Sequence, residues 1–514
     1  MNNFTHSKSI KTRLTQLLLL CAGLLLFVDG YTQQRETGYK IETFGSFSTG
    51  EHTPFWMVYH NWGMVPLDAN NAYLKGAVFH DQTINHDWSF RLGLDLAGSY
   101  PYAYKPVWIQ QLYGELNWKN WRLKIGSKED YTSQLNEQLS SGDFNLSNNA
   151  RPLPELKISM TDYWLVPYTK GNFYFKGDFA VGKYLDGEWQ KSMAQPTNQK
   201  YVMDCLSHHK SVYFRFGNIE DRNNMQFTVG FNHYAQWGGS IYHPKSGTME
   251  QQPQGWDDFF RVMIAKEGGA NASGTDQAYV SGSQTGSYLF KFDYKLKNTN
   301  KLSLYVQHFF DDGSGMHPLQ SYPDNLIGFE FQHNKRSLLS GLVFEYVHTT
   351  QQTGPIHFNM EMNDAHAGIR QLGNGNDDYY NNFEYIQGPS HFGRTMGTPL
   401  FLSPEYNTDG RLNFKSNRII AYHLGVEGYL SPNLAVRVLA TTGQSWGRYY
   451  VPFVEVKDGF ASNLDLIYTV PTIENLDIKL SAGYNTGDFF DEKAFGMGIT
   501  ITKQGILKKL GRQQ

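Results

Sequence analysis

Residues 107–128, VWIQQLYGELNWKNWRLKIGSK, consist of two segments that alternate apolar and polar residues around Lys119-Asn120. Because successive side chains of a strand point to opposite faces, this pattern predicts a β-hairpin with a short turn. The opposite face of the second segment carries Arg122 and Lys124. The predicted apolar face carries Leu112, Leu116, Trp118, Trp121, Leu123 and Ile125.

Such a hairpin is compatible with a soluble β-sandwich and with a membrane β-barrel, since both alternate apolar and polar positions. In a membrane barrel the polar face lines a wet lumen. On the lipid face an Arg or Lys would cost roughly 2–4 kcal/mol at mid-membrane. Arg122 and Lys124 are therefore expected to point into the lumen and to set the register.

Alternating runs recur along the rest of the chain, and they predict an all-β protein. Between residues 129 and 211 two long links would be adjacent, which breaks the alternation of short turns and long loops, so we assign a further strand to residues 161–167. The prediction is a transmembrane antiparallel β-barrel of about 18 strands, with both termini periplasmic and long extracellular loops. The other predicted strands are 39–48, 72–81, 87–98, 107–118, 121–129, 172–184, 211–217, 225–234, 287–296, 301–310, 325–333, 337–348, 418–430, 434–442, 461–470, 476–485 and 493–503.

The N-terminus has the pattern of a cleaved secretory signal peptide, residues 1–32. Lys8, Lys11 and Arg13 precede an apolar core at 17–28, which small and polar residues follow. Residues 33–514 are then one barrel domain, integral to the outer membrane. Cys21 follows the large Leu20, which argues against a lipoprotein site.

Composition supports this interpretation. Aromatic residues at 15% and 50 glycines favour β structure. A net charge of −3 provides no basic surface field, so nucleic acid is excluded as a partner. The two cysteines form no disulfide framework and no metal cluster.

The loop sequences resemble the capsule-assembly Wzi family of outer-membrane proteins. The likeness rests on PFWMVYHNWG (54–63), LSSGDFNLSNNARPLPE (139–155), FFDDGSGM (309–316), NDDYYNNFEY (376–385) and GTPLFLSPEYN (397–407). The resemblance implies an eighteen-stranded, non-enzymatic lectin that binds capsular or other surface polysaccharide and helps attach the capsule to the cell. The best-known members carry a periplasmic helical bundle before the barrel. Here strands begin soon after the leader, so either a plug comes from the loops or the pore is less occluded than the family implies.

A lectin site needs flat apolar surface for sugar rings and planar polar groups for hydroxyls. Three clusters and Tyr406 offer these groups, and the alternative is that they pack the loops together or form an aromatic belt. The predicted polysaccharide-binding residues are Trp56, Tyr59, Trp62, Asn148, Asn149, Arg151, Asp377, Asp378, Tyr379, Tyr380, Asn381, Asn382 and Tyr406.

Metal and catalytic motifs are weaker. We expect no metal and no cofactor, because the histidines 52, 60, 208 and 209 lack metal-site spacing. The acidic residues could bind Ca²⁺, but they fit no EF-hand, and turn formation is favoured. They are Asp311, Asp312, Asp324, Asp377 and Asp378. The string around Ser445 matches a nucleophile elbow, which requires a helix where a second strand is predicted here.

Three functions remain open at this stage. The first is a surface lectin, with outer-membrane lipid around it, capsule-export machinery as a further partner and a monomeric state. The second is a porin-like diffusion channel for small solutes, since eighteen strands enclose an aqueous lumen. The third is an outer-membrane hydrolase that uses Ser445.

Overall fold

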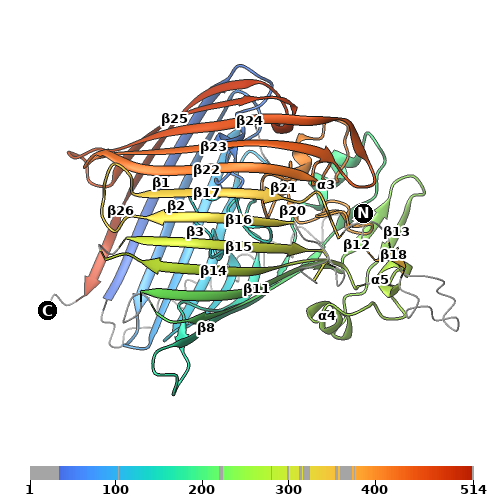
Figure 1. Cartoon of the computed structure of the whole chain (residues 1–514), viewed down its shortest axis with the longest axis horizontal. Coiled ribbons are helices and arrows are strands. Elements are labelled where there is room, and N and C mark those ends of the chain that lie inside the picture. Colours follow the sequence, from blue (N-terminus) through green and yellow to red (C-terminus); the bar gives the residue numbers. More distant parts are fainter. Residues whose placement is uncertain are drawn as a thin grey trace, which may run out of the picture.

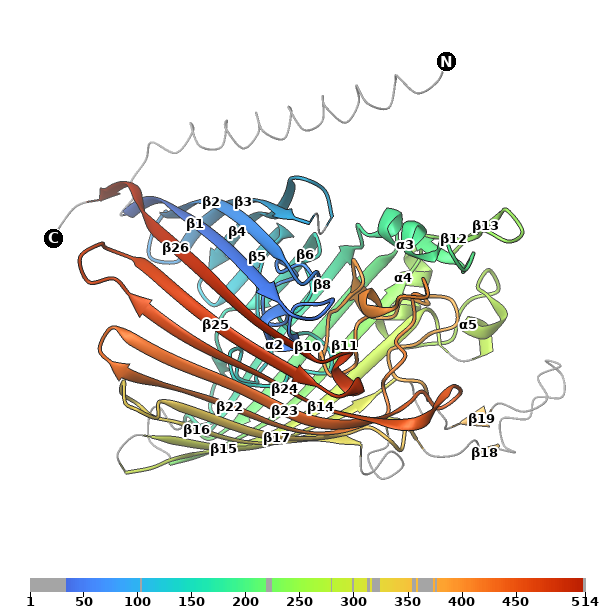
Figure 2. The ribbon, with the colours of Figure 1, turned by 90° about the horizontal axis from the view of Figure 1, so that it is seen from above.

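The chain forms a closed antiparallel β-barrel in which β26 pairs with β1. The computed structural model describes residues 34–101, 104–218, 224–278, 280–297, 300–311, 315–316, 324–353, 357–358, 373–374 and 377–511. Figure 2 shows the closure, with β26 (red) beside β1 (blue). The predicted fold class is confirmed. The predicted signal peptide lies outside the described residues.

Eighteen strands make up the barrel within the described residues. They are β1 (Gln34–Ser48), β2 (Asn71–Thr83), β3 (Trp88–Tyr100), β4 (Trp108–Trp118), β5 (Trp121–Ser127), β6 (Glu155–Met160), β8 (Phe173–Lys183), β10 (Leu206–Phe216), β11 (Met225–Trp237), β14 (Ser283–Lys295), β15 (Lys301–Phe310), β16 (Asn325–Gln332), β17 (Gly341–His348), β22 (Ile419–Ser431), β23 (Leu434–Gly447), β24 (Pro452–Thr469), β25 (Leu476–Thr486) and β26 (Ala494–Gly511).

The two faces of the wall differ as the hairpin predicted. Leu112 pairs across the sheet with Ser127, and Trp118 with Trp121, so Lys119-Asn120 is the turn. Lys124 is 1% exposed inside the barrel, whereas Ile125 is 60% exposed on the outside. The outer surface of the wall is therefore apolar and fits lipid, and the inner surface carries the charges.

The added strand is placed differently from the prediction. Residues 161–167 do not form it; the wall is completed by β6 (Glu155–Met160), which pairs with β8 from Gly182 to Asp178. A two-residue segment, β7 (Trp164–Leu165), continues on the same edge of β8 after an irregularity. The prediction was wrong because ELKISM follows Pro154 directly, and we assigned it to the preceding loop.

The connections separate the barrel into a turn end and a loop end (Figure 1). β1 begins and β26 ends at the turn end, where Trp88, Trp118, Trp121 and Trp164 are exposed in an aromatic belt. In barrels of this kind the short turns face the periplasm and the long loops face outwards. The loop end is therefore the outer end.

Small elements gather at the loop end. They are α2 (Phe55–Val58), α3 (Gly187–Ala194), α4 (Trp256–Met263), α5 (Gly274–Ala278), β9 (Tyr201–Met203), β12 (Ser240–His243), β13 (Thr248–Gln251), β18 (His357–Phe358), β19 (Gly373–Asn374), β20 (Ser390–His391), β21 (Arg394–Thr395), η2 (Pro404–Tyr406) and η3 (Asp488–Phe490). In the described part of the chain, none of the helices combines the length and the apolar character that crossing a bilayer requires.

Candidate functional site

Three loop segments turn back into the lumen, and we call them plug segments. The first, residues 52–68, contains α2. Its Trp56 indole Nε1 donates a 3.0 Å hydrogen bond to Thr441 Oγ1 on β23. The Phe55 backbone N–H donates to Asn485 Oδ1 on β25 at 3.2 Å. The first plug segment is thereby held against the inner wall of β23 and β25.

The second plug segment, residues 129–154, leaves β5 and reaches the opposite wall. There Ser140 Oγ and the Ser141 backbone N–H donate to the two carboxylate oxygens of Glu345 on β17, at 2.7 and 2.6 Å. His423 Nε2 on β22 lies 2.8 Å from the Leu139 carbonyl oxygen. A Cβ at position 425 would overlap that oxygen, so Gly425 permits the close approach. The segment thus crosses the lumen.

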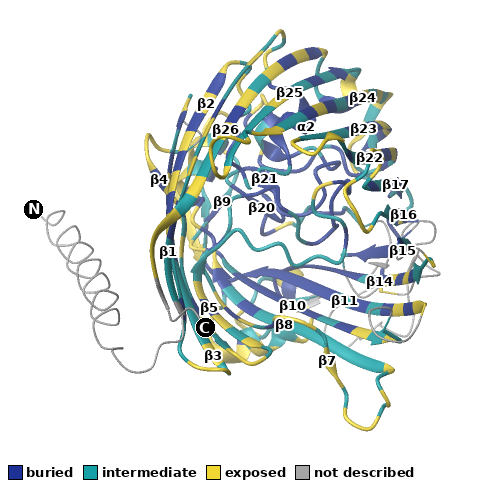
Figure 3. Cartoon of the chain, turned by 90° about the vertical axis from the view of Figure 1, so that its left-hand side faces the viewer, coloured by how far each residue is buried: buried dark blue, intermediate teal, exposed yellow. Residues whose placement is uncertain are grey.

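The third plug segment, residues 377–417, locks onto the other two. Tyr380 donates its hydroxyl to the Phe144 carbonyl oxygen of the second segment. Tyr59 of the first segment donates to Ser403 Oγ at 2.9 Å. Figure 3 shows the result from the turn end, with buried loop segments inside the ring of strands. Of the two outcomes left open by the sequence, a plug made from loops and a less occluded pore, the structure has the first.

A buried ion pair ties the third segment to the first. Arg394 is 3% exposed, and its Nε and Nη2 donate to Glu405 at 2.7 and 3.0 Å. Its Nη1 donates to the Val65 carbonyl oxygen at 3.0 Å. Burial opposes the guanidinium charge, but Glu405 outweighs burial and raises the pKa of Arg394 above its usual range.

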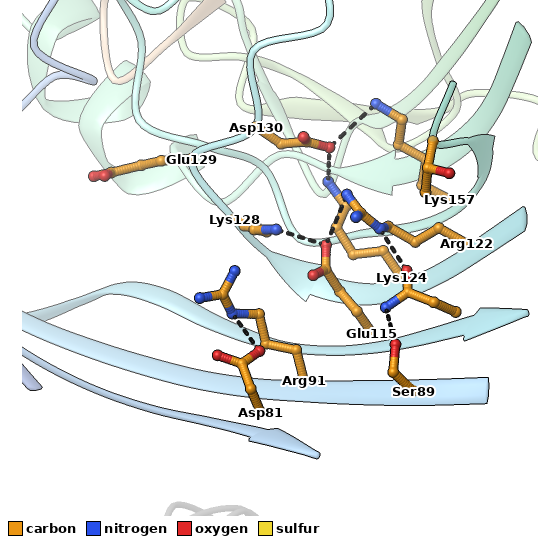
Figure 4. A network of polar contacts seen from close by, with 12 residues as sticks. Asp81, Ser89, Arg91, Glu115, Arg122, Lys124, Lys128, Glu129, Asp130 and Lys157 are labelled. Atoms are coloured by element: carbon orange, nitrogen blue, oxygen red, sulfur yellow. Dashed lines mark hydrogen bonds and ion pairs between the residues drawn. The ribbon is translucent and has the colours of Figure 1, made fainter. Parts of the chain in front are cut away.

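The lumen wall near β2 to β6 is lined by paired charges (Figure 4). Lys128 Nζ lies 2.7 Å from Glu115 Oε1, and Lys124 Nζ lies 2.7 Å from Glu155 Oε1. Asp130, at the start of the second plug segment, lies 3.2 Å from Lys124 and 3.4 Å from Lys157. Burial would raise the pKa of Asp130, but the neighbouring lysines hold it well below its usual value. This network attaches the plug to the wall.

Most of the predicted polysaccharide-binding residues are inside the plug. Trp56, Tyr59, Asn148, Asn149, Tyr379, Tyr380 and Tyr406 are all below 9% exposed. Asp378 binds Arg448, Asn381 and Asn417, with the last of these at 2.6 Å. Asn382 Oδ1 accepts two backbone N–H groups, and the backbone of Trp62 bonds Asn148 and Gln110. Their contacts favour the alternative that they pack the loops together.

Two of the predicted residues, Asp377 and Arg151, differ from the buried plug residues in their contacts. Asp377 accepts a hydrogen bond from Thr353 Oγ1 and remains partly exposed. Arg151 Cζ lies 5.2 Å from the Tyr104 ring centroid and 5.1 Å from the Phe392 centroid, beside two rings whose own centroids are 4.5 Å apart. Its contacts therefore differ from those of Asn148 and Asn149, with which we grouped it.

The acidic loop residues are occupied by protein donors. Asp324 accepts hydrogen bonds from the backbone N–H groups of Gln351 and Gln352, at 3.0 and 2.5 Å, and from the Tyr379 hydroxyl at 3.1 Å. Asp312 lies outside the described residues. These bonds join Asp324 to residues 27, 28 and 55 positions further along the chain, so they tie segments together and do not test turn formation, which we favoured over Ca²⁺ binding.

One group of three ligand side chains, His52, Asp491 and Glu492, comes together among the described residues. His52 Nδ1 is 2.6 Å from Asp491 Oδ2, and the His52 backbone N–H donates to Glu492 at 2.8 Å. The hydrogen bond that His52 makes to the Asp491 carboxylate raises the pKa of His52, against the effect of burial. An ion pair across the rim accounts for these contacts.

Ser445 lies within β23, and the chain leads from that strand into β24. Its hydroxyl lies 2.7 Å from Ser416 Oγ and accepts the Gly447 N–H at 3.1 Å. A nucleophile elbow requires a strand, a sharp turn and a helix. The motif match around Ser445 therefore lacks its structural context.

The outermost structure above the plug, which we call the outer cap, consists of α3, β9, β12, β13 and residues 383–386. The rings of Tyr201 and Tyr242 stack with centroids 5.4 Å apart and planes 4° apart. Phe383 is 70% exposed, and Lys200 Nζ lies 4.1 Å from its ring centroid. An outer-cap groove of about 400 Å³ is lined by Glu188, Lys191, Ser192, Ala194, Gln195, Asn198, Tyr201 and Pro244.

Sequence reasoning missed this groove and the residues that anchor the plug. Glu345 and His423 alternate correctly as lumen residues, so nothing local distinguishes them from other wall positions. Arg394 and Glu405 are separated by 11 residues, and Glu405 stands within the motif GTPLFLSPEYN. That motif was the one available signal. The outer-cap groove requires α3, β9 and Pro244 to come together, which no motif indicated.

An apolar outer wall, a charged inner wall and long loops at one end define an outer-membrane β-barrel, here with a plug made from its own loops. A model of the family described as "Capsule assembly protein Wzi" matches residues 70–402. The chain belongs to the capsule assembly protein Wzi family, which confirms the resemblance. A search of curated proteins found no match.

Two solved structures are similar to this chain at low sequence identity. The Wzi protein of Escherichia coli, described as an outer-membrane carbohydrate-binding β-barrel involved in group 1 capsule assembly, has a TM-score of 0.53 and 13% identity, covering 92% of this chain and 85% of that chain. OccAB2 of Acinetobacter baumannii has a TM-score of 0.46 and 10% identity, covering 92% of this chain and 98% of that chain. The first of these similarities supports the fold.

Proposed function

We propose that this protein is a non-enzymatic surface lectin that binds capsular or other surface polysaccharide and helps attach the capsule to the cell. The observation that carries the proposal is the plug. Three interlocked segments occupy the lumen and support an outer cap, whose groove lies at the end that faces away from the cell. Membership of the Wzi family and the name of the Escherichia coli structure support the same role.

The outer-cap groove has the chemistry that a sugar requires. Gln195 and Asn198 offer amide donors and acceptors for hydroxyl groups, and Tyr201 offers an aromatic edge. A volume of about 400 Å³ lies within the range of small-ligand sites, roughly 300–1,000 Å³. We place the sugar contacts here, and we assign a positioning role to the buried residues among the earlier candidates.

Binding of purified capsular polysaccharide to the detergent-solubilised protein tests the groove. Replacing both amides, Gln195→Ala with Asn198→Ala, removes two hydrogen-bonding groups and should weaken binding by about ten-fold or more. Asn433→Ala, at the exposed turn end, is the matched control and should bind like the parent protein. Unchanged affinity in the double variant would remove the groove from the proposal.

Cells provide the functional test. A strain that lacks the protein should shed capsule into the medium, and the parent gene should restore retention. The double variant should restore retention only in part. Capsule that stays on the surface of the deletion strain would contradict an attachment role.

The channel alternative is tested by conductance in planar bilayers. A polar cavity of about 280 Å³ lies between residues 133–136 of the second plug segment and the lumen wall at Arg215, Lys291 and Asp293. Because this space is bounded by the plug, we expect no stable open channels. Stable conductance without polysaccharide affinity would favour a diffusion pore.

Three further expectations belong to the same proposal. Ser445→Ala should leave polysaccharide binding unchanged, and incubation with the protein should leave the polymer length unchanged. The protein should purify as a monomer, with its signal peptide removed at about residue 32. Capsule-export proteins are the partners to test by crosslinking on intact cells.

A further inference from the structure

The barrel wall has a notch at the loop end, between β4 and β8. β4 begins at Trp108, but its pairing with β5 begins only at Leu112, because β5 ends at Ser127. β6 begins at Glu155, whereas β8 continues to Lys183. The first four residues of β4 therefore have no neighbouring strand on the β5 side, and loop residues fill the gap.

A lateral groove of about 830 Å³ occupies this notch. Its wall is mostly apolar, and it includes positions that point away from the lumen. Leu96 is 45% exposed, Val107 65%, Ile109 40% and Leu112 42%. Leu185, Trp189 and Phe392 border the groove on the side of α3. The lateral groove is thus continuous with the surface that meets the hydrocarbon of the membrane.

Arg151 lies in this apolar setting without a carboxylate partner among the described residues. Its Cζ lies 5.2 Å from the Tyr104 ring centroid and 5.1 Å from the Phe392 centroid. Its Nη2 donates to the Ile109 carbonyl oxygen at 2.5 Å, on the unpaired part of β4. Lys105, which is exposed, also borders the groove. Two cations therefore stand beside an apolar groove at the end of the wall.

We propose that the lateral groove binds a lipid of the outer leaflet, with an acyl chain along β3 and β4 and an anionic head group at Arg151 and Lys105. Charge complementarity and continuity with the lipid-facing wall carry the assignment. Because the groove is continuous with the lipid-facing wall, an acyl chain can enter it sideways from the membrane without passing through the lumen. Glu188 borders the groove as well, but it lies 3.9 Å from Lys191.

Helix α4, at the loop end beside β8 and β11, also carries exposed aromatic residues. Phe259 of α4 packs outside the wall, with its ring 6.3 Å from Phe179 and 5.6 Å from Trp237. Trp256 is 80% exposed and Phe260 53% exposed on the free face of this helix. Such residues are typical of a helix that lies at a membrane interface. The lateral groove lies at the loop end of the same wall, and we place its opening near the lipid head groups.

Trp189 gives the groove its own optical signal. The full-length mature protein is reconstituted into phosphatidylcholine vesicles that contain brominated-chain phosphatidylglycerol, or brominated-chain phosphatidylcholine for comparison. In each lipid, the fluorescence of Trp189→Phe is subtracted from that of the parent protein. The difference is the emission of Trp189, and its quenching reports lipid in the groove. We expect stronger quenching of Trp189 by the anionic lipid. The preference should fall about five-fold for each cation removed in Arg151→Gln and Lys105→Gln.

Matched variants keep the test decisive. Lys245→Gln removes an exposed cation from the β12–β13 turn and should keep the preference. Ile109→Phe narrows the groove without adding a tryptophan and should weaken quenching of Trp189 by both lipids. Heat-modifiable migration on gels verifies that each variant is folded. Equal quenching by both lipids, unaffected by either cation substitution, would overturn the proposal. So would a double cation variant that loses affinity for purified polysaccharide but keeps its lipid preference.

Discussion

The plug and the outer cap use the same kinds of residue in opposite ways. In the plug, Trp56 and Tyr380 are at most 2% exposed, and both use their polar atoms inside the protein. In the outer cap, Phe383 is 70% exposed. Aromatic and amide residues in long loops are therefore not in themselves a sign of ligand binding. What distinguishes the two roles is whether the protein already satisfies the polar atoms.

The comparison predicts its largest effect at the buried ion pair. Arg394→Ala leaves Glu405 and the Val65 carbonyl without their partner, and it should lower the free energy of unfolding by about 4 kcal/mol. Unfolding by guanidinium chloride in detergent measures this change in the free energy of unfolding. The control Arg411→Ala removes an exposed pair with Asp409 in the same segment and should cost less than about 1 kcal/mol. Equal costs would erase the distinction between plug and surface.

A pH effect tests the base of the outer cap. Asp186, just before α3, is fully buried, and burial raises its pKa to about 6. Its charge therefore destabilises the folded state above about pH 6, and stability should rise as the pH falls from 7 towards 4. The rise should total about 3 kcal/mol.

Asp186→Asn should flatten that pH profile, because the residue no longer titrates. Thermal unfolding at several pH values provides the measurement. The exposed Asp204→Asn is the control and should keep the profile of the parent protein. A profile that does not change in Asp186→Asn would show that another group is responsible.

A smaller effect is expected at α2. Trp56→Phe removes the hydrogen bond to Thr441, whose hydroxyl still has His423 at 2.7 Å, and should cost about 1 kcal/mol. Hydrogen exchange of the amides in residues 52–68 should accelerate. Trp256→Phe, in the exposed face of α4, should leave both quantities unchanged. Faster exchange in both variants would point to a general loss of aromatic packing.

The smallest effect is expected at the rim. The Asp491 hydrogen bond raises the pKa of His52, so the ion pair stabilises the fold below about pH 6.5 and is lost as the pH rises through the raised value. The two side chains are partly exposed, at 22% and 25%, so we expect less than about 1 kcal/mol. Asp491→Asn should remove this dependence. A rise in stability with pH in the parent protein would contradict the assignment.

Several parts of this fold were predictable because their cause is local. In residues 107–128 the alternation of apolar and polar side chains shows which face meets lipid. Arg122 and Lys124 must point inwards, because a charge on the lipid face is costly. The family resemblance was likewise recoverable from contiguous motifs. The added strand was misplaced because β6 is short and directly follows the second plug segment, with no turn between them to mark where the strand begins.

The sequence by itself determined the barrel, its register and the presence of long loops, since alternation and turn chemistry act over a few residues. Only the tertiary structure decided what the loops do. Ser140 meets Glu345 and Tyr59 meets Ser403 across separations of 205 and 344 residues. The residues next to a tyrosine in the sequence do not predict that its hydroxyl will hydrogen-bond to a distant segment. Whether a loop residue supports the plug or faces a ligand therefore depends on the closed barrel that brings those segments together.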